Sequence, residues 1–169
     1  MSDDISIRIA LPALLPALRA YGRTLARNTS AADDLVQEAL LRALRSEEQF
    51  HPGTDLRAWV FSILRNVWLG QLRLDGRERR AMAGRDIEKS IQADQTDRME
   101  LSNLSRAMET LPVSYREALM LVGAHGMTNA QAAAVVGVAE GTIKARVSRA
   151  RASLRALLPR GEDNTDTNE

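Results

Sequence analysis

The chain has 169 residues, of which 44% are hydrophobic and only 4% aromatic, and its formal net charge is +1. Because it has no cysteine and only two histidines, disulfides and thiolate metal sites are excluded and a histidine metal cluster is not expected. Leucine, alanine and arginine are frequent and β-branched runs are scarce, which predicts an all-α fold.

The first part of the chain is predicted to form two helices. Apolar residues at helical spacing, from Leu14 to Leu25, predict the first. Ser30 with Asp33 three residues later resembles a capping box, which predicts a second helix over residues 31–45. Since the N-terminus lacks the basic start of a signal peptide and no segment approaches the ~20 apolar residues that span a bilayer, we expect a cytoplasmic chain without membrane insertion.

A polar loop and a third helix follow. The loop sequence QFHPGTD, residues 49–55, contains a Pro-Gly turn signal. Thr54 or Asp55 is positioned to cap a helix over residues 56–73. This helix is apolar around most of its circumference, which places it at the centre of a helical bundle.

The predicted third helix also carries one polar stripe. At about 100° per residue, four polar side chains fall within a stripe roughly 100° wide: Ser62, Arg65, Asn66 and Arg73. The remaining face includes Trp59 and Trp68. These tryptophans lie at helical spacing among valine, isoleucine and leucine, so we interpret them as core residues rather than as platforms on which bases stack.

The middle of the chain separates two predicted domains. From Asp75 to about Ser102, charges of both signs replace the apolar pattern, which predicts a flexible linker that forms at most transient helix. Helical periodicity resumes at Leu104 and is broken by Pro112. We therefore predict two small helical domains, residues 8–80 and 104–160, with a flexible linker over residues 81–103 and a disordered tail over residues 161–169.

The second predicted domain contains a helix-turn-helix pattern, MTNAQAAAVVGVAEGTIKARVSRAR, with Gly137 in the turn and Thr128 as a helix cap. On a helical wheel, the second helix buries Ile143, Val147, Ala150 and Leu154. Its opposite face carries small residues, Ala145, Ser148 and Ala152, flanked by lysine and arginine. A basic stripe alone is more often a solvated face, but a helix-turn-helix with this strip favours insertion into the major groove of DNA.

Several motifs in a fixed order identify a family. These are ADDLVQEALLRAL, F-x-PGT-x-LRAW and ILRN in the first domain, and LP-x-x-YREALML, GMTNAQAAAVVGV and GTIKARVSRAR in the second. Over about residues 14–158 the chain resembles the extracytoplasmic-function (ECF) sigma factors of bacterial RNA polymerase. The motifs FHPGTDLRAW and LVGAHGM are most similar to the general stress-response group of alphaproteobacteria.

The resemblance implies roles for the first domain. One segment is expected to bind the β′ clamp of core polymerase: Asp34, Leu35, Gln37 and Glu38. Leu35 and Leu41 are also interpreted, in part, as core. The loop at residues 49–55 is expected to capture a base flipped out of the promoter −10 element. The implied −10 contacts are Phe50, His51, Gly53, Thr54, Asp55, Arg57, Arg65, Asn66 and Arg73, with phosphate charge from Arg77, Arg79 and Arg80.

In the second domain the resemblance implies contacts to the −35 element. These fall on Thr142, Lys144, Ala145, Arg146, Ser148, Arg149 and Arg151. The departures from the family pattern are Ala139, which offers no capping acceptor, and Ala145, which can make only apolar or backbone-proximal contacts. The implied partners are core RNA polymerase through its β′ clamp and β flap, promoter DNA and an anti-sigma factor, without a cofactor or metal.

We therefore predict a transcription initiation factor with no catalysis of its own, since no nucleophile–base set or Gly-rich phosphate loop is found. One rival interpretation is a sigma-like decoy that binds an anti-sigma factor. Such decoys carry a fused receiver domain, for which this chain, ending at Glu169, has no room. A second rival is a plain helix-turn-helix regulator, which leaves the motif DDLVQEALLRAL unexplained.

Overall fold

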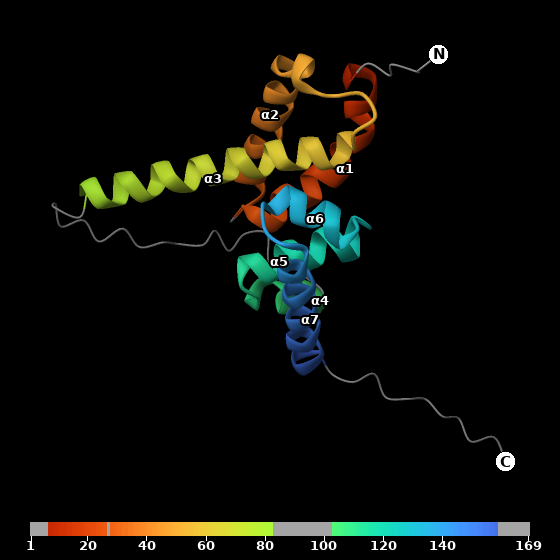
Figure 1. The fold of residues 1–169 in the computed structure, drawn as a ribbon. Helices are drawn as coiled ribbons and strands as arrows, with labels where there is room; N and C mark the ends of the chain where they lie inside the picture. The colour runs from red at the N-terminus through yellow and green to blue at the C-terminus, as the bar shows by residue number, and fades with distance from the viewer. Residues whose placement is uncertain (1–6, 27, 83–102, 159–169) are drawn as a thin grey trace.

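A computed structural model describes residues 7–26, 28–82 and 103–158 (Figure 1). Throughout these ranges the regular elements are helices and no strand is present, which confirms the predicted all-α fold. They are α1 (Ile7–Leu25), α2 (Thr29–Arg45), η1 (Glu47–Gln49), α3 (Leu56–Met82), α4 (Asn103–Thr110), α5 (Val113–Leu119), η2 (Met120–Ala124), α6 (Asn129–Val136) and α7 (Glu140–Leu157). Within these residues, the helices are too short or too polar to cross a membrane.

The first unit consists of α1, α2 and the first half of α3, packed around fully buried side chains such as Leu18, Leu35 and Leu64. Helix α2 begins two residues earlier than the Ser30–Asp33 box predicts, so that prediction is wrong. Its cap is Asn28, whose Oδ1 accepts a hydrogen bond from the Ala31 N–H at 2.8 Å. Asn28 has extended backbone angles that suit an N-cap, whereas Ser30 already lies inside the helix.

The predicted cap of α3 is confirmed at Asp55. Its Oδ1 accepts hydrogen bonds from the N–H groups of Arg57 and Ala58, at 3.0 and 3.2 Å. Trp59 and Trp68 pack against the core but are only half-buried, and the Trp59 ring also contacts Phe50, with centroids 5.3 Å apart. The tryptophans are therefore core residues at the edge of the bundle, as their spacing indicates.

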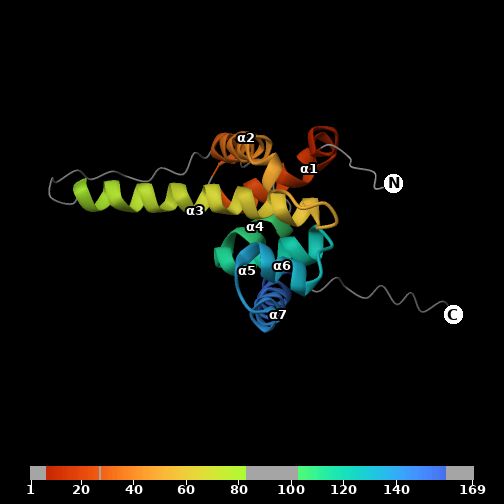
Figure 2. The same cartoon turned by 45° about the horizontal axis from the view of Figure 1, so that its top comes forward.

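Helix α3 continues beyond its predicted end. The expectation that helix gives way to linker at Asp75 is wrong, because α3 runs to Met82 and projects away from the other helices as a rod (Figures 1 and 2). Residues 73–82 contain good helix formers and no proline, and a projecting helix needs no apolar stripe. The Nε atoms of Arg79 and Arg80 also donate to carbonyls four residues earlier. The rest of the predicted linker, 83–102, and the tail lie outside the described residues.

The second unit contains the predicted helix-turn-helix. Thr128 caps α6 in a capping box with Gln131, and Gly137 ends α6 with φ 74°, a left-handed conformation that glycine adopts readily. Ala139 precedes α7 without a side-chain hydrogen bond to its first turn, as its sequence implies. Helix α4 closes the far end, where Ala107 and Leu111 pack against α7.

The two predicted units are packed together. One buried apolar cluster runs from α1–α3 into α5, η2 and the first half of α7, and α3 lies against α6. At its centre the Tyr21 ring stacks on Phe61, with centroids 4.9 Å apart, and the plane of the His125 ring is nearly perpendicular to both. We call the boundary between residues 7–82 and residues 103–158 the seam.

Candidate nucleic-acid and protein interfaces

Helix α7 presents the face that its sequence predicts. Ile143, Val147, Ala150 and Leu154 are buried against α4–α6, as the helical wheel requires. Of the predicted contact residues, four are exposed and three are half-buried. The exposed ones are Lys144, Ser148, Arg149 and Arg151, and the half-buried ones are Thr142, Ala145 and Arg146. The result is an outward strip of small side chains with basic side chains along its edges.

One of these basic residues has a partner on its own helix. The Lys144 Nζ lies 3.3 Å from the Glu140 Oε1, one turn earlier, and both side chains are exposed. Such an exposed pair contributes less than about 1 kcal/mol. A phosphate can therefore replace Glu140 as the partner of Lys144 at little cost.

The loop at residues 50–55 is ordered by its own turn. Gly53 has φ 89°, and the Thr54 hydroxyl donates to the His51 carbonyl at 2.7 Å. His51, Gly53 and Thr54 are exposed, while Phe50 is half-buried on Trp59. Both carboxylate oxygens of Asp55 accept hydrogen bonds. One caps α3, and the other accepts from the Gln131 Nε2 of α6 at 2.7 Å.

The predicted stripe on α3 is divided by the seam. Asn66 and Arg73 are exposed, as are Arg77, Arg79 and Arg80 on the projecting part of the helix. Arg57 and Arg65 instead lie at the seam. The Arg57 guanidinium sits 5.6 Å from the centroid of the Phe61 ring, and the Arg65 Nε donates to the Glu117 Oε1 at 2.8 Å. The structure thus separates two predicted −10 residues from the rest.

Sequence reasoning missed Glu117, which lies at the centre of the seam. Its side chain is only 2% exposed, and its Oε1 also accepts a hydrogen bond from the Tyr21 hydroxyl at 2.7 Å. Burial first, and the Glu117 charge second, hold the pKa of Tyr21 well above its usual value. The one signal in the sequence is that the neighbours of Glu117 at i−4 and i+4, Val113 and Leu121, are apolar.

His125 is the second seam residue that the sequence pattern did not identify. It is 7% exposed, and its Nε2 has no hydrogen-bond partner among the described residues. Burial, together with the positive charge of Arg57, lowers the pKa of His125 to about 4. At neutral pH this imidazole is therefore uncharged.

The predicted protein-binding face on α2 is partly exposed. Asp34 and Gln37 are exposed and Glu38 is half-buried, whereas Leu35 is 1% exposed and belongs to the core. Leu41, which the pattern placed partly in the core, is 47% exposed and lies one further turn along the same face. The core interpretation is therefore confirmed for Leu35 and is wrong for Leu41.

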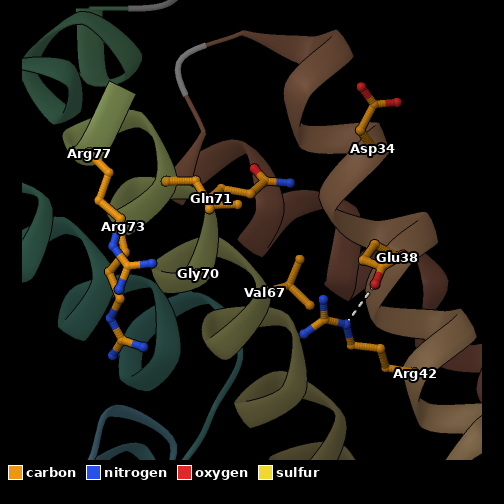
Figure 3. Close-up of a pocket in the computed structure, with 9 residues that line it drawn as sticks. Asp34, Glu38, Arg42, Val67, Gly70, Gln71, Arg73 and Arg77 are labelled. Carbon is orange, nitrogen blue, oxygen red and sulfur yellow. Dashed lines mark hydrogen bonds and ion pairs between the residues drawn. The ribbon is translucent and has the colours of Figure 1, made fainter. Parts of the chain in front are cut away.

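A hollow separates this acidic edge of α2 from the basic stripe of α3. Figure 3 shows Asp34 and Glu38 on one side and Arg73 and Arg77 on the other, with Val67 and Gln71 between them. Glu38 accepts a hydrogen bond from the Arg42 Nε at 2.6 Å. The two predicted interfaces, for protein on α2 and for DNA on α3, thus lie on opposite rims of one hollow. Within the described residues there is no group of acidic or histidine side chains arranged to hold a metal ion.

Two sequence families match the chain. Residues 12–78 match Sigma-70 region 2 and residues 101–154 match Sigma-70, region 4. The ECF RNA polymerase sigma factor EcfG of Rhodopseudomonas palustris is 46% identical over 155 residues, which cover 90% of this chain and 85% of EcfG.

Solved structures agree with these matches. The sigma factor RpoE of Bartonella quintana, solved in complex with the anti-sigma factor NepR, superposes with a TM-score of 0.75 at 41% identity, covering 89% of this chain and 94% of RpoE. CnrH, solved with the cytosolic domain of CnrY, gives a TM-score of 0.65 at 26% identity, covering 89% and 86% of the two chains.

Proposed function

Because the chain belongs to the ECF sigma factors of bacterial RNA polymerase, which act in transcription initiation, we propose that its two units divide promoter recognition between them. Helix α2 binds the β′ clamp of core polymerase, the loop at residues 49–55 and α3 engage the −10 element, and α7 reads the −35 element. The second unit also contacts the β flap. The observation that carries this proposal is the outward face of α7, where a strip of small side chains lies between basic ones on the second helix of a helix-turn-helix.

The remaining parts of the proposal concern partners and setting. RpoE was solved with the anti-sigma factor NepR and CnrH with the cytosolic domain of CnrY, and we propose that this chain too is bound by an anti-sigma factor. Its resemblance to the alphaproteobacterial stress-response group supports stress-response promoters as targets. Core polymerase is cytoplasmic, and so is the proposed site of action. We assign no catalytic step to this chain, since the phosphodiester chemistry belongs to the polymerase.

Reconstitution tests this function directly. The purified chain is mixed with core RNA polymerase that lacks other sigma factors, captured by pull-down, and used for run-off transcription from promoter fragments of its own genome. We expect a stable complex and transcripts that depend on the added chain. A chain that binds an anti-sigma factor but neither core polymerase nor promoters would instead be a decoy.

We expect the α2 face to be required for polymerase binding. Asp34→Lys combined with Glu38→Lys should weaken binding to core polymerase, because both carboxylates lie on the face that we assign to the clamp. Since Asp34 is exposed and Glu38 forms a half-exposed pair with Arg42 one turn away, the free energy of unfolding should change by no more than about 0.5 kcal/mol. Binding is measured by titration of labelled chain with core polymerase.

A matched control comes from η1. Glu48 is exposed and outside α2, so Glu48→Lys changes the charge in the same sense without touching the proposed face. Leu41→Ser extends the test, because an exposed leucine on this face should add apolar contact to the clamp. Equal affinity of the double variant, the control and the unmodified chain would remove α2 from the interface.

A further inference from the structure

Side-chain hydrogen bonds from Tyr21, Arg65 and Gln131 cross the seam, and two of them end on one oxygen. The Glu117 Oε1 of α5 accepts from the Tyr21 hydroxyl of α1 at 2.7 Å and from the Arg65 Nε of α3 at 2.8 Å. The third runs from the Gln131 Nε2 of α6 to the Asp55 Oδ2 at 2.7 Å. Polar side chains from both family-matched segments therefore bind one another where the segments meet.

The Glu117 cluster is buried more deeply than surface ion pairs are. Tyr21 is 0% exposed, and the side chains of Glu117 and Arg65 are 2% and 16% exposed. A carboxylate removed from water is strongly unfavourable unless it is paired and hydrogen-bonded. Glu117 is paired only while α3 and α1 lie against α5, so its burial depends on the packed arrangement of the two units.

This packed arrangement is incompatible with simultaneous contact to both promoter elements. The −10 and −35 elements lie about 25 base pairs apart, which is ~85 Å along B-DNA at about 3.4 Å per base pair. Here α6, the first helix of the helix-turn-helix, lies directly on α3, the helix that we assign to the −10 element. The units must separate before α3 and α7 can reach sites that far apart.

The same contacts occupy residues that we assign to DNA. Arg65 and Asp55 belong to the proposed −10 surface, yet Arg65 pairs with Glu117 and Asp55 with Gln131. A carboxylate and a phosphate present similar anionic oxygens to a guanidinium group. Glu117 therefore lies where a phosphate of the −10 strand would lie if Arg65 contacted DNA.

We propose that Tyr21, Arg65 and Glu117 form a latch that holds the free chain closed, and that Glu117 masks Arg65 by replacing a DNA phosphate. The latch is autoinhibitory: the closed chain cannot engage a promoter, and opening exchanges the Glu117 carboxylate for nucleic acid. The masking half of this proposal rests on the proposed role of Arg65 at the −10 element, whereas the latch itself rests on the seam contacts alone.

Glu117→Gln tests the latch, because it keeps the shape of the side chain and removes its charge. Since the chain has no cysteine, Arg45→Cys on α2 and Ala156→Cys on α7, both exposed, supply sites for a donor and an acceptor dye. Single-molecule energy transfer in the full chain then measures the open fraction. We expect the ratio of open to closed molecules to rise about tenfold with Glu117→Gln, which leaves the Arg65 charge without its counterion.

Two further variants keep the test decisive. Glu109→Gln removes the same charge from an exposed position on α4 and should leave the open fraction unchanged. Tyr21→Phe keeps the ring stacked on Phe61 but loses the hydroxyl, so it should open the chain less than Glu117→Gln does. Circular dichroism confirms that each variant remains helical. Identical energy-transfer histograms for Glu117→Gln, Tyr21→Phe and the unmodified chain would overturn the latch.

Binding of fluorescent single-stranded oligothymidine, which supplies phosphates without a promoter sequence, tests the masking separately. If Glu117 masks Arg65, Glu117→Gln should bind the oligonucleotide several-fold more tightly, and the added Arg65→Met substitution should remove the gain. Opening without any gain in affinity would support the latch but overturn the masking and the −10 role of Arg65. Run-off transcription by the holoenzyme reports independently on whether the proposed function holds.

Discussion

Replacing Arg149 with alanine is expected to lower the affinity of the holoenzyme for its −35 element by about 1–3 kcal/mol and to blunt its discrimination between matched and mutated sites. Arg149 is exposed beside the strip of Ala145, Ser148 and Ala152, midway along α7. Small side chains allow the helix to approach the floor of the major groove, so a long side chain at their edge can reach a base. A bidentate arginine–guanine contact accounts for a loss of this size.

Arg155 is the matched control for this prediction. It is also exposed on α7 but lies in the last turn of the helix, whereas a recognition helix contacts base edges through its N-terminal part. Arg155→Ala should therefore weaken binding to all sequences about equally. It should also reduce, by roughly one, the steepness with which the logarithm of the binding constant falls with the logarithm of the salt concentration. Two variants, two duplexes and a salt titration make the comparison. If Arg149→Ala reduced affinity for both duplexes by one factor, Arg149 would be a phosphate contact, and base recognition would move to Lys144 or Ser148.

Local chemistry in the sequence was sufficient to predict the helix-turn-helix. The four buried positions of α7, the Thr128 cap and the Gly137 turn depend on residues within a few positions of one another, and the structure has all of them. The end of α3 was predicted wrongly because the apolar pattern measures burial rather than helicity. Past Asp75 the helix continues in solvent, where no apolar stripe marks it.

The seam could not be predicted because its contacts join residues far apart in sequence. In the sequence, Arg65 is indistinguishable from the other polar side chains of the α3 stripe. It pairs with Glu117 because α5 packs beside α3. The sequence pattern predicts an ordinary exposed glutamate at position 117. Only its apolar neighbours on the same helical face, Val113 and Leu121, indicate burial. Nothing local indicates that α1, α3 and α5 meet at one carboxylate, since that depends on how the two units pack.

Acidification from pH 7 to pH 5 is expected to lower the free energy of unfolding by about 2 kcal/mol through His125 alone. Burial and the Arg57 charge lower the folded-state pKa of this imidazole to about 4, against an ordinary value of 6.5. The unfolded chain therefore takes up a proton near pH 6.5 while the folded chain does not. Stability contributed by neutral His125 is present above pH 6.5 and is lost as the pH falls toward 4.

Chemical denaturation at several pH values measures this loss, with the range above pH 5 chosen because ordinary carboxylates stay charged there. His125 faces Tyr21, Phe61 and Arg57 at the seam, and the raised pKa of Tyr21 keeps its hydroxyl protonated throughout this range. His125→Leu should make the free energy of unfolding nearly independent of pH between 7 and 5. Because the substitution also alters packing, the change of this free energy with pH is compared rather than its absolute value. The other histidine, His51, is exposed in the loop, and His51→Gln serves as the control because it keeps His125 and should retain the loss that His125 causes. A slope that survives His125→Leu would mean that the acid sensitivity of the chain arises from groups other than His125.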